Sequence, residues 1–300
     1  LRLPFRAPFD AAGILEFLGT RAVPGVEEFE DGTYQRTMRL PHGSGIAELS
    51  DGGDHVRCVL RLENLRDLGA AVQRCRRLLD LDADPVAIAE ALGRDPVLGL
   101  LVRRSPGRRV PGSVDGAELA VRAVLGQQVS VVGARNLAGR LVSRLGEPLA
   151  GPLAGISGGL THLFPEPAAI AGADPATFAM PEARRTALAG LAEAIASGDV
   201  VLDPGTDREA TEKRLLSLRG IGPWTASYVA MRALGDPDAF LPADLGVRRA
   251  VERLGRDGRA AGVSVLAEKW RPWRAYAVQH LWTSLDDGAT EGPTNREVVA

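Results

Sequence analysis

The chain has 300 residues, of which 45% are hydrophobic, enough for a sizeable core and two or three domains. Its formal net charge of −2 is not that of a strongly basic nucleic-acid-binding protein, and its two cysteines exclude a disulfide framework or a cysteine metal cluster. Two segments, 101–150 and 248–274, are nevertheless basic, each with eight Arg or Lys residues against three acidic ones. Solvated helix faces are the simpler explanation from charge alone, although phosphate contacts also require such basic patches.

Cys58 and Cys75 lie in apolar runs and are predicted to be buried free thiols. No apolar run reaches membrane-spanning length and no signal peptide is present, so we expect no membrane contact and a cytoplasmic location. The chain begins at Leu1 without a methionine, which fits a piece of a longer polypeptide as well as it fits trimming.

Residues 1–85 are predicted to form a small α+β domain. Three segments, TYQRTMRLP, GIAELSD and HVRCVLRLEN, have the pattern of strands and are separated by turn-rich PHGSG and DGGD. Helical periodicity frames them in DAAGILEFLGTRAV and NLRDLGAAVQRCRRLLDL. We therefore expect an antiparallel sheet accompanied by helices.

From residue 86 onward the pattern is helical, which predicts a mostly α protein. The segment SVDGAELAVRAVLGQQVSVVGARNLAGRLVSRLG has helical spacing and offers Ser113 or Asp115 as an N-cap. Further helices are predicted in PATFAMPEARRTALAGLAEAIASGD, DREATEKRLLSL, PWTASYVAMRAL and VSVLAEKWRPWRAYAVQHLWTSL. The tail, residues 286–300, has nothing to pack and is predicted to be disordered.

The segment LRGIGPWTASYVA predicts a tight turn between two helices. Gly220 and Gly222 permit backbone angles that other residues avoid, and Pro223 suits the first turn of a helix. Free N–H groups at the start of such a helix can bind a phosphate. A glycine turn alone, however, is more often only a turn.

Aromatic residues follow this turn. Trp224 and Tyr228 are four residues apart and share one helix face. The chain has only fourteen aromatic residues, yet four more lie close together near its end: Trp270, Trp273, Tyr276 and Trp282. Rings beside a phosphate-binding turn suit stacking on an extruded cationic base. Core packing is the alternative, and it is our interpretation of Trp270 and Trp273.

Taken with FLPADLGV and KWRPWRAYAVQHLW, this hairpin resembles the helix-hairpin-helix DNA glycosylase superfamily, and in particular its DNA-3-methyladenine glycosylase II family. The resemblance covers nearly the whole chain. It implies two helical lobes flanking an active-site cleft, beside the antiparallel-sheet domain. One lobe, 115–230, would contain the hairpin, and the other would combine 86–114 with 231–285 and carry the catalytic residue.

The resemblance implies a hydrolase that flips alkylated purines such as 3-methyladenine and 7-methylguanine out of DNA and hydrolyses the N-glycosidic bond. Asp244, in LPADLGV, matches the catalytic aspartate of the family. A carboxylate there would stabilise the oxocarbenium-like sugar, and a cationic base would leave without a proton donor. Taken alone, the same aspartate would more simply cap a helix.

The residue after Pro223 bears on the mechanism. Bifunctional relatives have a lysine there, whose amine attacks the sugar, whereas this chain has Trp224. The resemblance therefore implies a monofunctional enzyme that leaves an intact abasic site for base excision repair. No cofactor is expected to be required, and the two cysteines exclude the iron–sulfur cluster that some relatives carry.

The resemblance also assigns binding residues. The base pocket would consist of Phe17, Trp224, Tyr228 and Trp282. Gln128 would be the wedge that enters the duplex where the base has left, at a position where the best-known relative has leucine, and Gln127 could be structural. A phosphate would bind the backbone amides of Gly220, Gly222 and Thr225. A structural monovalent cation could bind the carbonyls of Leu216, Leu218 and Ile221.

The implied partner is double-stranded DNA of the nucleoid, bound by a monomer. In some actinobacteria this glycosylase is fused behind an adaptive-response regulator domain, and such a fusion would explain the missing methionine. Two alternatives stay open: a non-catalytic helix-hairpin-helix DNA-binding module, and a relative specialised for oxidised or deaminated bases. Asp244 and the aromatic cluster argue against the first, and Trp224 argues against an enzyme for oxidised guanine, which normally keeps the lysine.

Overall fold

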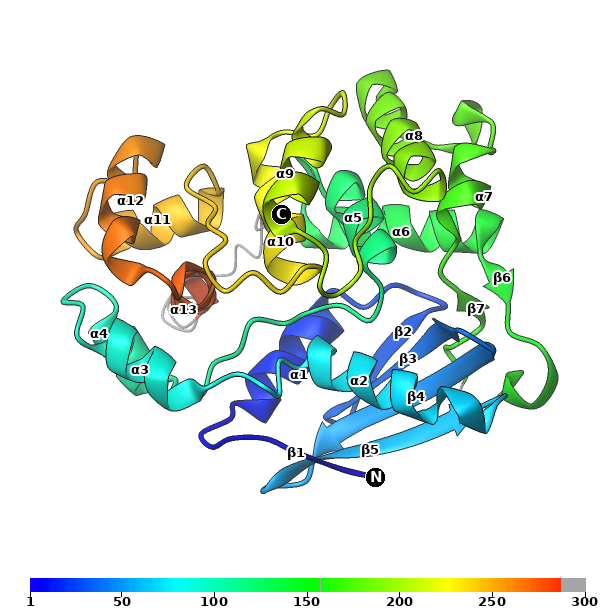
Figure 1. Cartoon of the computed structure of the whole chain (residues 1–300), viewed down its shortest axis with the longest axis horizontal. Coiled ribbons are helices and arrows are strands. Elements are labelled where there is room, and N and C mark those ends of the chain that lie inside the picture. The colour runs from blue at the N-terminus through cyan, green and yellow to red at the C-terminus, as the bar shows by residue number, and fades with distance from the viewer. Residues whose placement is uncertain (157, 287–300) are drawn as a thin grey trace.

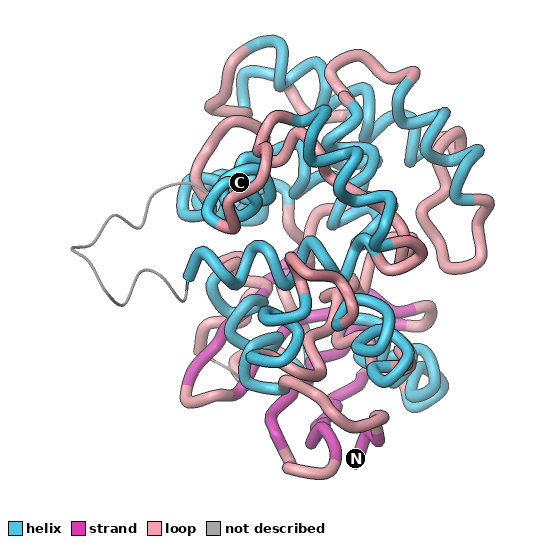
Figure 2. Tube along the Cα trace, turned by 90° about the vertical axis from the view of Figure 1, so that its left-hand side faces the viewer, coloured by secondary structure: helices cyan, strands magenta, loops and turns pink. Residues whose placement is uncertain are grey.

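The computed structural model describes residues 1–156 and 158–286, so all but the first residue of the tail predicted to be disordered lies outside the described residues. A β-sheet with two helices against it forms one end of the molecule, and two groups of helices lie beyond it (Figure 1). Figure 2 shows the same separation of strands from most of the helices. No helix within the described ranges is both long and apolar enough to span a membrane.

The large sheet is antiparallel, with the strand order β1-β5-β4-β3-β2. Its strands are β1 (Arg2–Pro4), β2 (Glu27–Glu30), β3 (Thr33–Leu40), β4 (Gly43–Asp51) and β5 (His55–Leu62). The three predicted strands are therefore confirmed, whereas β1 and β2, with three and four residues, are too short for alternation to indicate them.

Helices α1 (Ala11–Thr20) and α2 (Leu68–Leu78) share one hydrophobic core with the sheet, because strand residues such as Tyr34 and Met38 alternate toward them. Cys58 and Cys75 lie in this core, which confirms the prediction of buried free thiols. A short two-stranded sheet, β6 (Glu147–Pro148) with β7 (His162–Leu163), lies where the chain returns to the large sheet.

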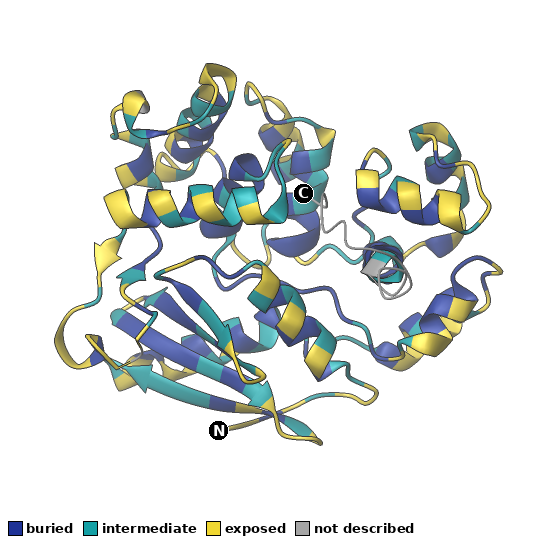
Figure 3. Ribbon diagram, turned by 180° about the vertical axis from the view of Figure 1, so that it is seen from behind, coloured by how far each residue is buried: buried dark blue, intermediate teal, exposed yellow. Residues whose placement is uncertain are grey.

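The remaining helices form two groups, each with its own hydrophobic core. One group contains α5 (Gly116–Leu125), α6 (Val131–Leu145), α7 (Pro167–Ala171), α8 (Glu182–Ala196), α9 (Arg208–Leu216) and α10 (Pro223–Arg232). The other contains α3 (Pro85–Gly93), α4 (Gly99–Arg104), α11 (Leu245–Arg253), α12 (Ala260–Ala267) and α13 (Arg274–Asp286). The buried residues follow the inward faces of these helices (Figure 3).

Helix α10 joins the two groups, because its opposite faces enter different cores. Ala226 and Val229 pack in the first core, and Ala230 and Met231 pack in the second. Tyr228 packs against both cores, so this part of α10 lies close to both groups of helices.

Two segments expected to be helical throughout are interrupted. Of the two N-cap candidates, Asp115 caps α5 by accepting from Glu118 N, but the helical spacing then breaks at residues 126–130 before α6. The segment VSVLAEKWRPWRAYAVQHLWTSL likewise divides into α12 and α13, because Pro272 lacks an N–H and cannot continue a helix. As interpreted from the sequence, Trp270 is buried in the core, and Trp273 packs against it.

A buried ion network ties the sheet to the first group of helices. Arg36 on β3 donates to Glu27 Oε1 of β2 at 3.0 Å and to Glu118 Oε2 of α5 at 2.7 Å. Arg122 of α5 donates to both carboxylates at 2.9 Å. Two guanidinium groups and two carboxylates therefore neutralise one another in the interior.

Asp80, which follows α2, joins the end of the molecule that contains the sheet to the second group of helices. Its Oδ2 atom accepts from Val110 N at 3.2 Å and from the Tyr276 hydroxyl of α13 at 2.8 Å. Burial raises the pKa of Asp80 to about 6, although these two hydrogen bonds oppose the shift.

Candidate active site between the two groups of helices

Asp244 lies at the start of α11, where its side chain is held by three neutral donors. Oδ1 accepts from Val247 N at 2.9 Å and from Trp282 Nε1 at 2.8 Å, and Oδ2 accepts from Trp224 Nε1 at 2.9 Å. Only 2% of the residue is exposed. Asp244 is therefore a helix cap, but capping uses Oδ1 alone, and the carboxylate also binds two indoles.

The aromatic residues come from two helices that meet at this aspartate. Trp224 and Tyr228 stack on α10 with centroids 5.1 Å apart and planes 10° apart. Trp282 comes from α13 and is 8% exposed. A Cβ atom on Gly246 would lie 3.0 Å from Trp282 Cδ1, so the glycine of ADLGV lets this indole approach.

A cavity is lined by the four rings predicted to form the base pocket: Phe17, Trp224, Tyr228 and Trp282. Asp244 is not among the lining residues, but it accepts hydrogen bonds from the two indoles that line the cavity. At the other end, the cavity reaches the buried ion network. The structure thus brings together the predicted pocket residues and the predicted catalytic residue.

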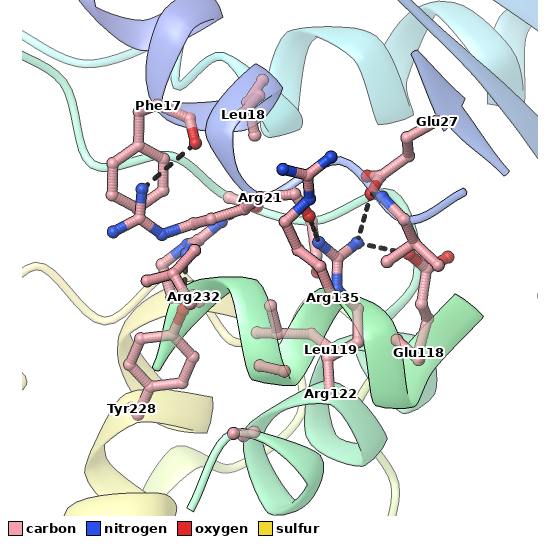
Figure 4. A pocket seen from close by; sticks show the side chains of 18 of the residues that line it. Phe17, Leu18, Arg21, Glu27, Glu118, Leu119, Arg122, Arg135, Tyr228 and Arg232 are labelled. Carbon is pink, nitrogen blue, oxygen red and sulfur yellow. Dashed lines mark hydrogen bonds and ion pairs between the residues drawn. The ribbon is translucent and has the colours of Figure 1, made fainter. Parts of the chain in front are cut away.

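Five arginines line this cavity, none of them expected from the sequence, and two of these, Arg21 and Arg232, lie over the Phe17 ring. The guanidinium carbon of Arg21 lies 3.7 Å from the Phe17 ring centroid, and that of Arg232 lies 5.0 Å from it. In Figure 4, both guanidinium groups are grouped with Phe17 and the Tyr228 hydroxyl at one end of the cavity. The spacing of Trp224, Tyr228 and Arg232 on one helix face was a signal for Arg232.

The hairpin between α9 and α10 has the geometry that its glycines indicate. Gly220 has a left-handed φ of +84°, and a Cβ atom there would lie 2.6 Å from Ala187 Cβ. Gly222 is the N-cap of α10 and offers no capping side chain, and Pro223 is the first helical residue. The start of this helix is therefore open to an anion.

The turn before α6 is tied to this hairpin. Gln127 Nε2 donates to Gly220 O at 3.1 Å and to Thr225 Oγ1 at 3.0 Å, which favours the structural interpretation of Gln127. Thr225 is buried. Gln128 has a φ of +57° and an exposed side chain.

Of the three carbonyls predicted to bind a cation, that of Leu218 accepts from Ile221 N at 3.1 Å, within the hairpin turn. Leu216 is the last residue of α9, so its carbonyl also lies at the hairpin.

The fold is that of a DNA glycosylase. The chain superposes on a 3-methyladenine DNA glycosylase from Archaeoglobus fulgidus with a TM-score of 0.81 and 23% sequence identity, over 97% of this chain and 100% of that one. This likeness confirms the predicted helix-hairpin-helix glycosylase fold, mostly α with a small antiparallel sheet.

Sequence comparison defines the family. A family model described as the AlkA N-terminal domain matches residues 1–115. The chain is 34% identical over 285 residues to DNA-3-methyladenine glycosylase 2 of Escherichia coli K12, covering 93% of this chain and 95% of that protein. It therefore belongs to the DNA-3-methyladenine glycosylase 2 family of DNA repair enzymes, as its motifs predict.

A longer relative is also similar. The chain is 50% identical over 299 residues to the "Probable bifunctional transcriptional activator/DNA repair enzyme AlkA" of Mycobacterium tuberculosis. The match covers 100% of this chain and 60% of that relative, so the chain spans about three fifths of the mycobacterial protein.

Proposed function

We propose that the protein removes alkylated purines, such as 3-methyladenine and 7-methylguanine, from double-stranded DNA by hydrolysing the N-glycosidic bond. The observation that carries the proposal is the Asp244 carboxylate, held by three neutral donors against two tryptophans that line a ring-walled cavity. Binding to DNA alone would need neither a buried unpaired carboxylate nor a pocket of rings.

The reaction follows from this arrangement. A flipped, cationic purine stacks on the rings, since a ring face attracts positive charge. As the bond between C1′ and the base nitrogen breaks, its electron pair neutralises the base, and positive charge develops on the sugar. Asp244 stabilises that charge because its three hydrogen-bond donors are neutral and no cation among the described residues forms an ion pair with it. Water then adds to C1′ and gives up a proton.

We also propose that the enzyme is monofunctional. The position where bifunctional relatives have a lysine is occupied by Trp224, whose indole N–H is bound to Asp244. The two lysines, Lys213 and Lys269, are exposed and do not belong to the cavity lining. Borohydride should therefore trap no covalent adduct with DNA, and the strand should stay intact until the abasic site is treated with alkali.

The proposed contacts with the DNA phosphates are made by backbone groups. A phosphate would bind the N–H groups around Gly220, Gly222 and Thr225, with a monovalent cation able to support the turn through the carbonyls of Leu216, Leu218 and Ile221. Gln128 is the proposed wedge, and its exposed side chain supports this role. Gln128→Ala should weaken binding to an abasic duplex by about tenfold; unchanged affinity would reject the wedge.

The proposed setting is the cytoplasm, where a monomer acts on nucleoid DNA. The bifunctional name of the mycobacterial relative, and the 60% of it that this chain spans, support the proposed fusion to an adaptive-response regulator. Determining the full reading frame tests the fusion directly.

The function is tested by measuring free bases released from methylated duplex DNA. Wild-type protein should release 3-methyladenine and 7-methylguanine, and Asp244→Asn should release neither while still binding the duplex. Binding without release by the wild type would favour the non-catalytic module. Release of only oxidised or deaminated bases from a mixed panel would favour a relative with another specificity.

A further inference from the structure

Arg232 is a buried cation in the wall of the proposed base pocket. It lies four residues after Tyr228 on the same face of α10, and only 5% of it is exposed. Its guanidinium donates to the carbonyl of Pro111, to Gly112 O at 3.2 Å and to the Tyr228 hydroxyl at 2.8 Å. These hydrogen-bond partners carry no formal charge, and among the described residues no carboxylate forms an ion pair with Arg232, although the charge of Glu27 favours its charged form.

This contact decides which way the Tyr228 hydroxyl can hydrogen-bond. A guanidinium only donates, so the hydroxyl oxygen must accept from Arg232. The hydroxyl hydrogen is then left for another acceptor, and among the residues described no protein group accepts it. Because Tyr228 and Arg232 both line the cavity, an atom of a base bound there can accept this hydrogen (Figure 4).

Such a wall treats charged and uncharged bases differently. A cationic base becomes neutral as the glycosidic bond breaks, and a buried guanidinium nearby does not assist it. An uncharged purine instead takes the electron pair of the C1′–N9 bond and becomes an anion. An O–H donor backed by a positive charge stabilises that anion as it forms.

We infer that Arg232 and Tyr228 together form a site that stabilises the leaving group of uncharged purines. They would determine specificity, in addition to the catalytic role of Asp244. This rests on the proposed function. In the step it serves, the C1′–N9 bond breaks with its electron pair going to N9, and the oxygen of water bonds to C1′. The proton released by that water ends on the base. Asp244 acts on the sugar half of the transition state, and the Tyr228 hydroxyl acts on the base half.

The test compares two duplexes of the same sequence that carry either hypoxanthine, an uncharged purine, or 7-methylguanine, a cationic one, at one position. Single-turnover base release is measured for the wild type, Tyr228→Phe and Arg232→Met. Tyr228→Phe keeps the stacking ring and removes only the hydroxyl. It should slow hypoxanthine release by about 10- to 100-fold, and slow 7-methylguanine release by about threefold or less.

Arg232→Met should shift the ratio of the two rates in the same direction, and its Tm reports whether the variant is folded. If Arg232→Met does not fold, the ratio for Tyr228→Phe decides alone. Equal losses on both lesions would overturn the inference and leave these residues as pocket packing. So would a wild type that releases 7-methylguanine but no hypoxanthine. A wild type that releases neither base would instead contradict the proposed function.

Discussion

Two regions of this protein bury carboxylates, and they compensate the buried negative charge in different ways. Glu27 and Glu118 are neutralised by Arg36 and Arg122, four charges that cancel in the interior. Asp244 is buried as deeply, yet its partners are two indole N–H groups and one backbone N–H. The comparison indicates that a paired carboxylate fixes a junction, whereas one held by neutral donors keeps its charge for a cationic transition state.

The pKa of Glu27 agrees with the first half of this comparison. Burial alone would raise it, but the neighbouring Arg122 and Arg36 outweigh burial and lower the pKa of Glu27. A lowered pKa means that this contribution to stability is present at neutral pH and is lost as the pH falls through the acid range.

The largest effect is expected from Asp244→Asn. Asparagine can still cap α11 through its oxygen, but its NH2 group cannot accept from Trp224 Nε1, so the Tm should fall modestly, whereas the loss of charge should slow base release by about a thousandfold or more. The matched control is Asp84→Asn, at the N-cap of α3, which should keep its rate. Substantial turnover by Asp244→Asn would break the comparison, because the charge would then have no catalytic role.

Glu118→Gln should instead act mainly on the stability of the fold. Removing this carboxylate leaves Arg36 and Arg122 sharing Glu27, which should destabilise the fold by about 3 kcal/mol in a denaturant titration. The exposed pair of Glu209 and Lys213 provides the control, since Glu209→Gln should leave the Tm unchanged. Equal Tm values for both variants would show that the network is not a structural junction.

Asp80 is an intermediate case, a half-buried carboxylate with neutral hydrogen-bond donors and a pKa raised to about 6. A folded-state pKa above the unfolded value gives stability that is complete below about pH 4 and lost as the pH rises through 6. Asp80→Asn has no ionisable group at this position, so its stability does not fall as the pH rises through 6. Asparagine also tolerates the φ of +51° found there. The free energy of unfolding of the variant, relative to that of the wild type, should rise by about 2 to 3 kcal/mol between pH 4 and pH 7. A pH-independent difference in unfolding free energy would contradict the raised pKa.

A smaller effect is expected from Trp224→Phe, which keeps a ring on α10 but removes the donor to Asp244 Oδ2. Base release should slow by about tenfold, the equivalent of one hydrogen bond. Trp273→Phe serves as the control, because this indole packs against the same core and does not belong to the cavity lining. If both variants lose activity equally, the indole N–H does not position the carboxylate.

The sequence predicts regular features well because they depend on neighbouring residues. Alternation indicates β3, β4 and β5, and the glycines with Pro223 indicate the hairpin before α10. The family motifs single out Asp244 and its rings, which the fold then brings together. Breaks within long periodic segments are harder to predict, as the interruption at Pro272 shows, since periodicity continues across it.

Contacts between distant segments are not predictable in this way. Tyr276 donates to Asp80 across 196 residues, and Arg36 meets Glu118 across 82, so no local pattern connects them. The role of Arg232 likewise depends on carbonyls more than 100 residues earlier in the chain. These contacts follow from how the sheet and the two groups of helices pack, which a single sequence does not show.

The central claim is that Asp244 stabilises a positive sugar. It is tested most directly by the Kd for duplexes that carry a cationic pyrrolidine or an uncharged tetrahydrofuran at the abasic position. The wild type should bind the cationic analogue about 100-fold more tightly, and Asp244→Asn should bind the two analogues with nearly equal affinity. The same preference in both proteins would contradict the account.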